Sequence, residues 1–188
     1  MNKKLFRLSL IVALVVSLGW VTMFRTTAPA AADAETEYFE AYNIVCPPIV
    51  SQKMWVSEDG VLHIRNRVLN SVVRSNSLYH NGIGQIISNA NIDLATMYGE
   101  YHGNLEIHPA AFPGSGWAGS FVVEITPAGQ NGHARLQGYG PALEGWSIKA
   151  ELTYLPPTVL AGFKDLCGGI QPLAGTRSNG YILKPGSE

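Results

Sequence analysis

The residues between positions 117 and 154 alternate between apolar and polar with the two-residue period of β-strands. One face of the first segment carries Trp117, Gly119, Phe121, Val123 and Ile125. The last segment sets Trp146, Ile148, Ala150, Leu152 and Tyr154 against Ser147, Lys149, Glu151 and Thr153. Between them, Asn131-Gly132 is typical of a hairpin turn, and alternation resumes at Ala134, Leu136 and Gly138. The pattern predicts three antiparallel strands with one face buried and one in water.

Less regular alternation predicts further strands on either side of this meander. The segments are residues 61–73, 84–93 and 99–108, and residues 181–183 form a candidate closing strand. In the first segment, Leu62 and Ile64 share one face, with His63, Arg65 and Arg67 on the other. A short helix over residues 70–79 competes there, although its Asn and Ser residues are poor helix formers.

These segments together predict an all-β domain over residues 35–188, with a C-terminal extension rich in Pro and Gly. Six to eight strands must protect their edges, and closing the sheet into a small barrel removes the edges. Glycines within the strand runs, such as Gly119 and Gly138, fit the bends of barrel strands. We therefore expect an antiparallel barrel, and a β-sandwich is the alternative because it uses the same alternation.

One sequence pattern resembles that of a known group of proteins. It consists of Trp117-x-Gly119-x-Phe121, Ile125, an Asn-Gly pair, Gly138-x-Gly140, Leu143-x-Gly145 and a long alternating strand. Over residues 84–154 this pattern is similar to that of small bacterial β-barrel proteins with an allene-oxide-cyclase-like fold. The resemblance implies an antiparallel barrel with an internal cavity. No catalytic motif of the plant cyclases is present, so the resemblance implies no activity.

Residues 1–34 have the pattern of a secretory signal peptide. Lys3, Lys4 and Arg7 precede an uncharged apolar run over residues 8–24, and small residues follow it. Cleavage after Ala32 or Ala34 would start the mature chain near Asp33 or Glu35. The run is also long enough for an uncleaved membrane anchor, the one membrane contact that we expect. Both interpretations export the body of the chain, as a secreted or an anchored protein.

Two cysteines, Cys46 and Cys167, lie near opposite ends of the exported body. In an oxidising compartment such a pair is typical of a disulfide, and no other cysteine competes for either partner. We expect a Cys46–Cys167 disulfide; two free buried thiols are the alternative.

The composition of the 188-residue chain excludes some partners. Its net charge of -1 provides no general attraction to nucleic acid, and no sequence motif indicates a cofactor. The length is sufficient for one sizeable core, so we expect a single domain after the leader.

The polar residues that could form a catalytic or metal site belong to one alternating segment. Glu100, His102 and Glu106, with Asn104 and His108, project from one side of a predicted strand. Such a set is usually the solvated face of a strand. The alternatives are a polar cavity lining or an acid/base or metal site completed by His63 or His80. We predict no metal ligand set, because residues six apart on one strand do not easily reach one ion.

Three functional classes follow from this sequence. An exported barrel would bind a small apolar ligand if its interior face, including Phe121, Trp146, Ile148 and Leu152, encloses a cavity. With a filled core it would be a structural or interaction module of the cell envelope. The third class is a barrel enzyme of cyclase or isomerase type that uses Glu100, His102 or Glu106. We rank the binding or envelope module above the enzyme.

Overall fold

The computed structural model describes residues 34–186, which contain eight strands and three short helical segments. The elements are β1 (Glu35–Val56), β2 (Val61–Ser75), η1 (Leu78–His80), β3 (Gly82–Asp93), β4 (Gly99–Pro109), β5 (Gly116–Thr126), β6 (Gly129–Tyr139), β7 (Ser147–Tyr154), α2 (Pro157–Leu160), η2 (Ala161–Cys167) and β8 (Ala174–Lys184). Residues 1–33, where the signal peptide or anchor is predicted, lie outside the described part.

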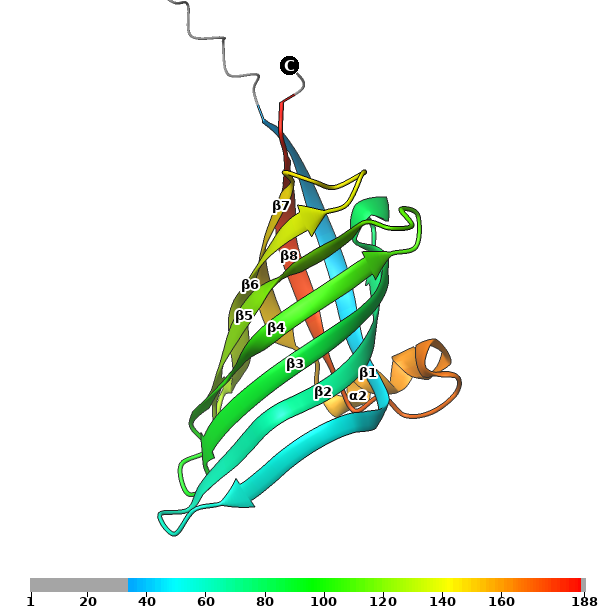
Figure 1. Ribbon diagram of the computed structural model, residues 1–188. Helices are drawn as coiled ribbons and strands as arrows, with labels where there is room; N and C mark the ends of the chain where they lie inside the picture. Colours follow the sequence, from blue (N-terminus) through cyan, green and yellow to red (C-terminus); the bar gives the residue numbers. More distant parts are fainter. Residues whose placement is uncertain (1–33, 187–188) are drawn as a thin grey trace, which may run out of the picture. The chain divides into compact units, whose positions relative to one another are not determined.

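The eight strands form one closed antiparallel barrel (Figure 1). Each strand pairs with its neighbours in sequence, and β1 pairs with β8 from Glu35↔Lys184 to Val45↔Ala174, which closes the sheet. This confirms the barrel and excludes the sandwich. The helix considered for residues 70–79 is wrong, because β2 continues to Ser75 and only the one turn of η1 follows.

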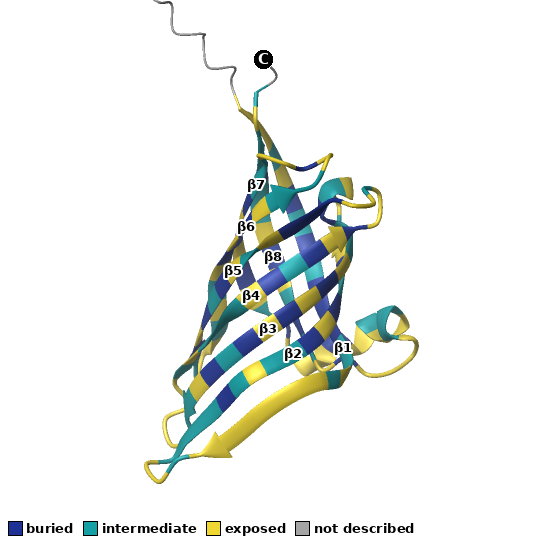
Figure 2. Cartoon of the chain, in the orientation of Figure 1, coloured by how far each residue is buried: buried dark blue, intermediate teal, exposed yellow. Residues whose placement is uncertain are grey.

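Buried and exposed residues alternate along the strands (Figure 2), and the buried residues are mostly apolar. On β7, Ile148 and Leu152 are buried, whereas Lys149 and Glu151 are exposed. Fully buried side chains from other strands complete the core; they include Ile107, Trp117, Leu136 and Ile182. None of the helical segments within residues 34–186 has the length and hydropathy to cross a membrane.

Strand β1 was not predicted, although it is the longest strand of the described chain. Phe39, Ala41 and Val45 point into the barrel, but Ile44 points outward and is nevertheless completely buried. Ile44 packs against Leu155 and Leu160 in a second, smaller core under α2. Apolar residues on both faces remove the two-residue period, and the alternation test therefore fails there.

The predicted Cys46–Cys167 disulfide is present, with the two Cα atoms 5.3 Å apart. It fixes η2 to the outer face of β1 and covers the second core. A disulfide of this kind is typical of proteins that fold in an oxidising, extracytoplasmic environment.

A β-bulge in β2 changes which of its side chains face inward. The register with β3 shifts between Ile64 and Arg67, and Asn66 at the shift has a φ of 50°. Ile64 before the bulge and Leu69 after it are both buried, although they are an odd number of residues apart. The expected outward position of Arg67 is therefore wrong: the extra residue turns Arg67 to the inside.

The predicted Asn131-Gly132 turn is also wrong. Both residues lie within β6, where Asn131 pairs with Glu124 and Gly132 pairs with Val123. The turn between β5 and β6 comes earlier, and Thr126 pairs with Gly129, whose φ is 144°. A glycine adopts that conformation without steric cost, so the positive φ decides the position of the turn.

Candidate functional site

The barrel encloses a cavity of about 220 Å³ that is lined by side chains from all eight strands. Most of the lining is aliphatic or aromatic. Three of the four residues expected to bind a ligand line it: Phe121, Ile148 and Leu152. An apolar cavity inside a rigid, closed sheet is the common form of a small-molecule site.

The fourth, Trp146, is not among the residues that line the cavity. It packs on the ring of Tyr79, with ring centroids 4.9 Å apart, and the Lys184 ammonium lies over both rings. Lys184 also pairs with Glu35 and Glu37 at 3.0 Å. These contacts gather around the first residues of β1 and the last of β8, at the upper end of the barrel in Figure 1.

Trp117 closes the same end from inside. Its side chain is fully buried, and its Nε1 donates a hydrogen bond of 2.6 Å to the carbonyl oxygen of Tyr79. At the lower end, by contrast, the lining residues Arg67, Tyr101 and Tyr154 are only partly buried. The lower end, where β1 turns into β2 and β3 into β4, is therefore the more accessible end of the cavity.

His80 is a buried titratable group of the cavity lining. Its ring packs edge-on against Phe39, with centroids 4.5 Å apart, and its Nδ1 has no hydrogen-bond partner in the described part of the chain. Burial lowers the pKa of His80 from 6.5 to about 4. The imidazole is therefore neutral at physiological pH.

This pKa predicts a pH dependence of stability. The unfolded chain protonates His80 near pH 6.5 but the folded chain only near pH 4, so acid in that interval favours unfolding. Between pH 7 and pH 4, we expect the wild type to lose about 2–3 kcal/mol more unfolding free energy than a His80→Phe variant. Urea denaturation at several pH values measures the difference. Parallel pH profiles for the two proteins would contradict the buried, neutral histidine.

Polar residues gather in the cavity toward the lower end of the barrel. Tyr101 is the third residue of β4, Gln130 the second of β6 and Tyr154 the last of β7, and all three line the cavity. Arg67 joins them from β2. We call Arg67, Tyr101 and Tyr154 the Arg–Tyr cluster.

The two tyrosines of the Arg–Tyr cluster share the electrostatic influence of Arg67. Burial raises the pKa of both Tyr101 and Tyr154, and the positive charge of Arg67 acts on each in the opposite direction. The two hydroxyls are therefore protonated at physiological pH and are available as hydrogen-bond donors.

The candidate polar set on β4 lies on the outer wall. His102 Nδ1 is 2.8 Å from Glu100 Oε1, and His108 Nε2 is 3.4 Å from Glu106 Oε1, with all four side chains substantially exposed. The hydroxyl of Tyr139 donates to Glu106 at 2.6 Å; burial and then this hydrogen bond raise the pKa of Tyr139 to about 12. The set is thus a row of Glu–His contacts on the surface.

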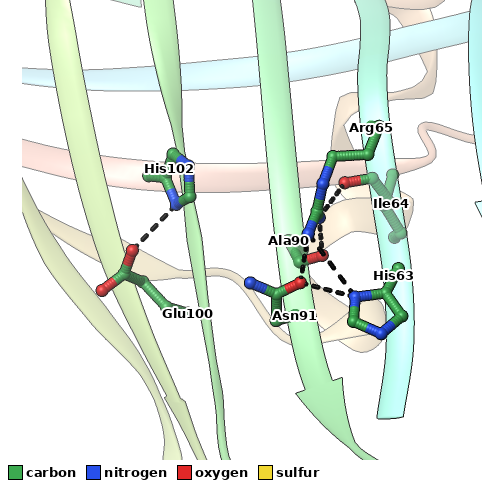
Figure 3. Close-up of polar contacts among 7 residues, drawn as sticks. All are labelled: His63, Ile64, Arg65, Ala90, Asn91, Glu100 and His102. Carbon is green, nitrogen blue, oxygen red and sulfur yellow. Dashed lines mark hydrogen bonds and ion pairs between the residues drawn. The ribbon is translucent and has the colours of Figure 1, made fainter. Parts of the chain in front are cut away.

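Neither histidine that was considered as a partner of this set joins it. His63 lies on β2, where its Nδ1 is 2.8 Å from Oδ1 of Asn91, and Arg65 donates to the same oxygen at 2.6 Å (Figure 3). Figure 3 shows the Glu100–His102 pair apart from this group, and His80 is inside the barrel. Within residues 34–186, no group of three or more His, Cys, Asp or Glu side chains is placed to hold a metal ion.

A second hollow, of about 540 Å³, lies on the outer wall over β6, β7, β8 and β1. It is larger than the interior cavity, but His133, Arg135, Lys149 and Glu151 line it. Charged side chains on a strand face in water need no ligand to explain them. The interior cavity is therefore the stronger candidate for a site.

Sequence reasoning found the apolar lining and missed the Arg–Tyr cluster. The alternation places Tyr154 on the interior face among apolar residues, and it does not single out Tyr101. Arg67 had been placed outside, and the one signal for its true position was Asn66, a residue type that tolerates positive φ.

Comparisons with protein-family models, curated proteins and solved structures find no match to this chain. The resemblance to barrels of allene-oxide-cyclase-like fold therefore rests on the sequence pattern alone.

Proposed function

We propose that this chain is an exported barrel that binds one small, largely apolar molecule in its interior. The single observation that carries the proposal is the cavity of about 220 Å³ within an otherwise closely packed core. A dry cavity of about 150 Å³ in another protein is large enough to bind benzene. The interior of this barrel thus accommodates a molecule of about one aromatic ring with a short substituent.

Binding of toluene tests the proposal, with two matched variants of β7. Ala150 lines the cavity and the adjacent Lys149 is exposed on the outer wall. Ala150→Leu would fill part of the cavity, whereas Lys149→Leu adds the same side chain outside. We expect toluene to shift the methyl NMR signals of Ile148 and Leu152 in the wild type and in Lys149→Leu. In Ala150→Leu we expect the affinity for toluene, measured by the same titration, to be at least about tenfold lower.

Absence of toluene binding to the wild type would contradict the proposal and favour an envelope module with a filled core. Native mass spectrometry of protein purified from its producing cell adds an independent measurement, because a retained small molecule gives a discrete mass increment. Release of that increment on Ala150→Leu but not on Lys149→Leu would place the molecule in the barrel.

Export is the second part of the proposal and is supported by the Cys46–Cys167 disulfide and by the basic and apolar pattern of the first residues. N-terminal sequencing of protein recovered outside the cytoplasm is expected to start near Asp33 or Glu35. An intact Met1 end in the membrane fraction would indicate an anchored protein instead. Recovery of the protein from the cytosol with both thiols free would contradict export altogether.

A further inference from the structure

Arg67 is a cation in the lining of the interior cavity. Its Nε atom is buried and has no hydrogen-bond partner in the described part of the chain. None of the ion pairs formed within residues 34–186 includes Arg67. Burial of Nε without a partner costs free energy, and an acceptor supplied by another molecule would remove that cost.

No residue that lines the cavity supplies that acceptor as an anion. Neither Asp nor Glu is among the lining residues, and the other titratable base, His80, is neutral there. The carboxylates of β4 are exposed on the outer wall. The cavity therefore has one positive charge and no negative charge of its own.

The bulge in β2 is what places this charge. Without the extra residue at Asn66, the alternation of β2 would direct Arg67 to the outer wall, beside Arg65. Tyr101 and Tyr154 line the cavity with Arg67 and add two protonated hydroxyls, so this side of the cavity has three side chains that donate hydrogen bonds. The rest of the lining is mainly aliphatic or aromatic, and its other polar residues are uncharged: Asn43, His80, Gln130, Thr176 and Ser178.

We propose that the ligand of this barrel is a small carboxylic acid, whose carboxylate pairs with Arg67 and accepts hydrogen bonds from Tyr101 and Tyr154 while its apolar body fills the cavity. The inference rests on the proposed function and adds the ligand class to it. A carboxylate matches the single cation in charge and in planar, two-oxygen geometry. A phosphate ester carries up to two negative charges, for which the cavity lining offers only one cation.

Calorimetric titration of the full chain at pH 7 with benzoate and with benzamide tests the charge preference. The two probes have nearly the same size and shape, so a difference in affinity reports the carboxylate. We expect benzoate to bind at least about tenfold more tightly than benzamide. Phenyl phosphate as a third probe is expected to bind more weakly than benzoate.

Two arginines of β2 provide the variant and its control. Arg67→Gln is expected to remove the preference for benzoate while toluene still binds, which also shows that the barrel is folded. Arg65→Gln changes an outward-facing arginine of the same strand and is expected to keep the preference. Tyr154→Phe removes one hydrogen-bond donor. We expect it to lower the affinity for benzoate severalfold and to leave the affinity for toluene unchanged.

The outcomes separate this inference from the proposed function. Binding of toluene with equal affinities for benzoate and benzamide would overturn the carboxylate and leave the apolar site in place. Tighter binding of phenyl phosphate than of benzoate would overturn it in favour of a phosphate ligand. Retention of the benzoate preference in Arg67→Gln would show that another group recognises the acid. If none of the probes binds the wild type, the proposed function fails together with this inference.

Discussion

Replacement of both cysteines by serine is expected to lower the free energy of unfolding by about 4–5 kcal/mol. Cys46 and Cys167 are 121 residues apart, so the disulfide closes most of the described chain into a loop in the unfolded state. Releasing a loop of that length restores conformational entropy to the unfolded chain, which the chain-entropy model values at this magnitude. Urea denaturation of the oxidised wild type and of the double serine variant measures the loss.

A local effect is expected beside the global one. The disulfide holds η2 against the outer face of β1, where Ile44, Leu155 and Leu160 form the second core. Without the covalent link this small cluster alone retains the segment, so cleavage by a protease between residues 157 and 173 should become faster while the barrel persists. Reduction of the wild type with a thiol reagent is the control, since it breaks the same bond without changing any side chain. A stability loss below about 1 kcal/mol in both experiments would contradict a stabilising role of the disulfide.

The strands that the sequence predicted best are those with one face in water. On β7, charged and apolar residues alternate without exception from Ile148 to Leu152, and the predicted faces are the observed ones. On β1, Ile44 is buried on the outer face by Leu160, so the pattern there depends on a segment more than a hundred residues later in the chain. The alternation of apolar and polar residues identifies a strand only where one face is buried and the other is exposed to water.

The same limit explains which part of the candidate site was predictable. The sequence predicts Phe121, Ile148 and Leu152 in the interior because the alternation of β7 is uninterrupted and that of β5 has Val122 as its main exception. Arg67 was assigned to the wrong face because a bulge is a single extra residue and reverses the parity of every residue after it. The size of the cavity was beyond prediction, since it depends on how side chains from eight strands fill one volume.

A pair of neighbouring substitutions tests which side chains of β7 face the interior. Ile148→Ala is expected to lower the free energy of unfolding by about 2–5 kcal/mol, because Ile148 is 1% exposed and its removed methyl groups leave a void between strands. Lys149→Ala, one residue along, is expected to change it by less than about 0.5 kcal/mol, because that side chain lies in water. Both variants are compared with the wild type in urea denaturation.

The size of the Ile148→Ala effect within its range also reports on the cavity. Ile148 lines the existing space, so its truncation enlarges a cavity that is already present and does not open a separate one. Ile182 is its pairing partner on β8 and is fully buried, but it does not line the cavity. Ile182→Ala therefore serves as the matched core truncation at a residue that does not line the cavity.

Saturating toluene should restore part of the stability of Ile148→Ala and less of that of Ile182→Ala, because a ligand that binds only the folded state stabilises it. Equal stability of the Ile148→Ala and Lys149→Ala variants would refute the inward orientation of Ile148. It would also contradict the assignment of Ile148 to the cavity lining.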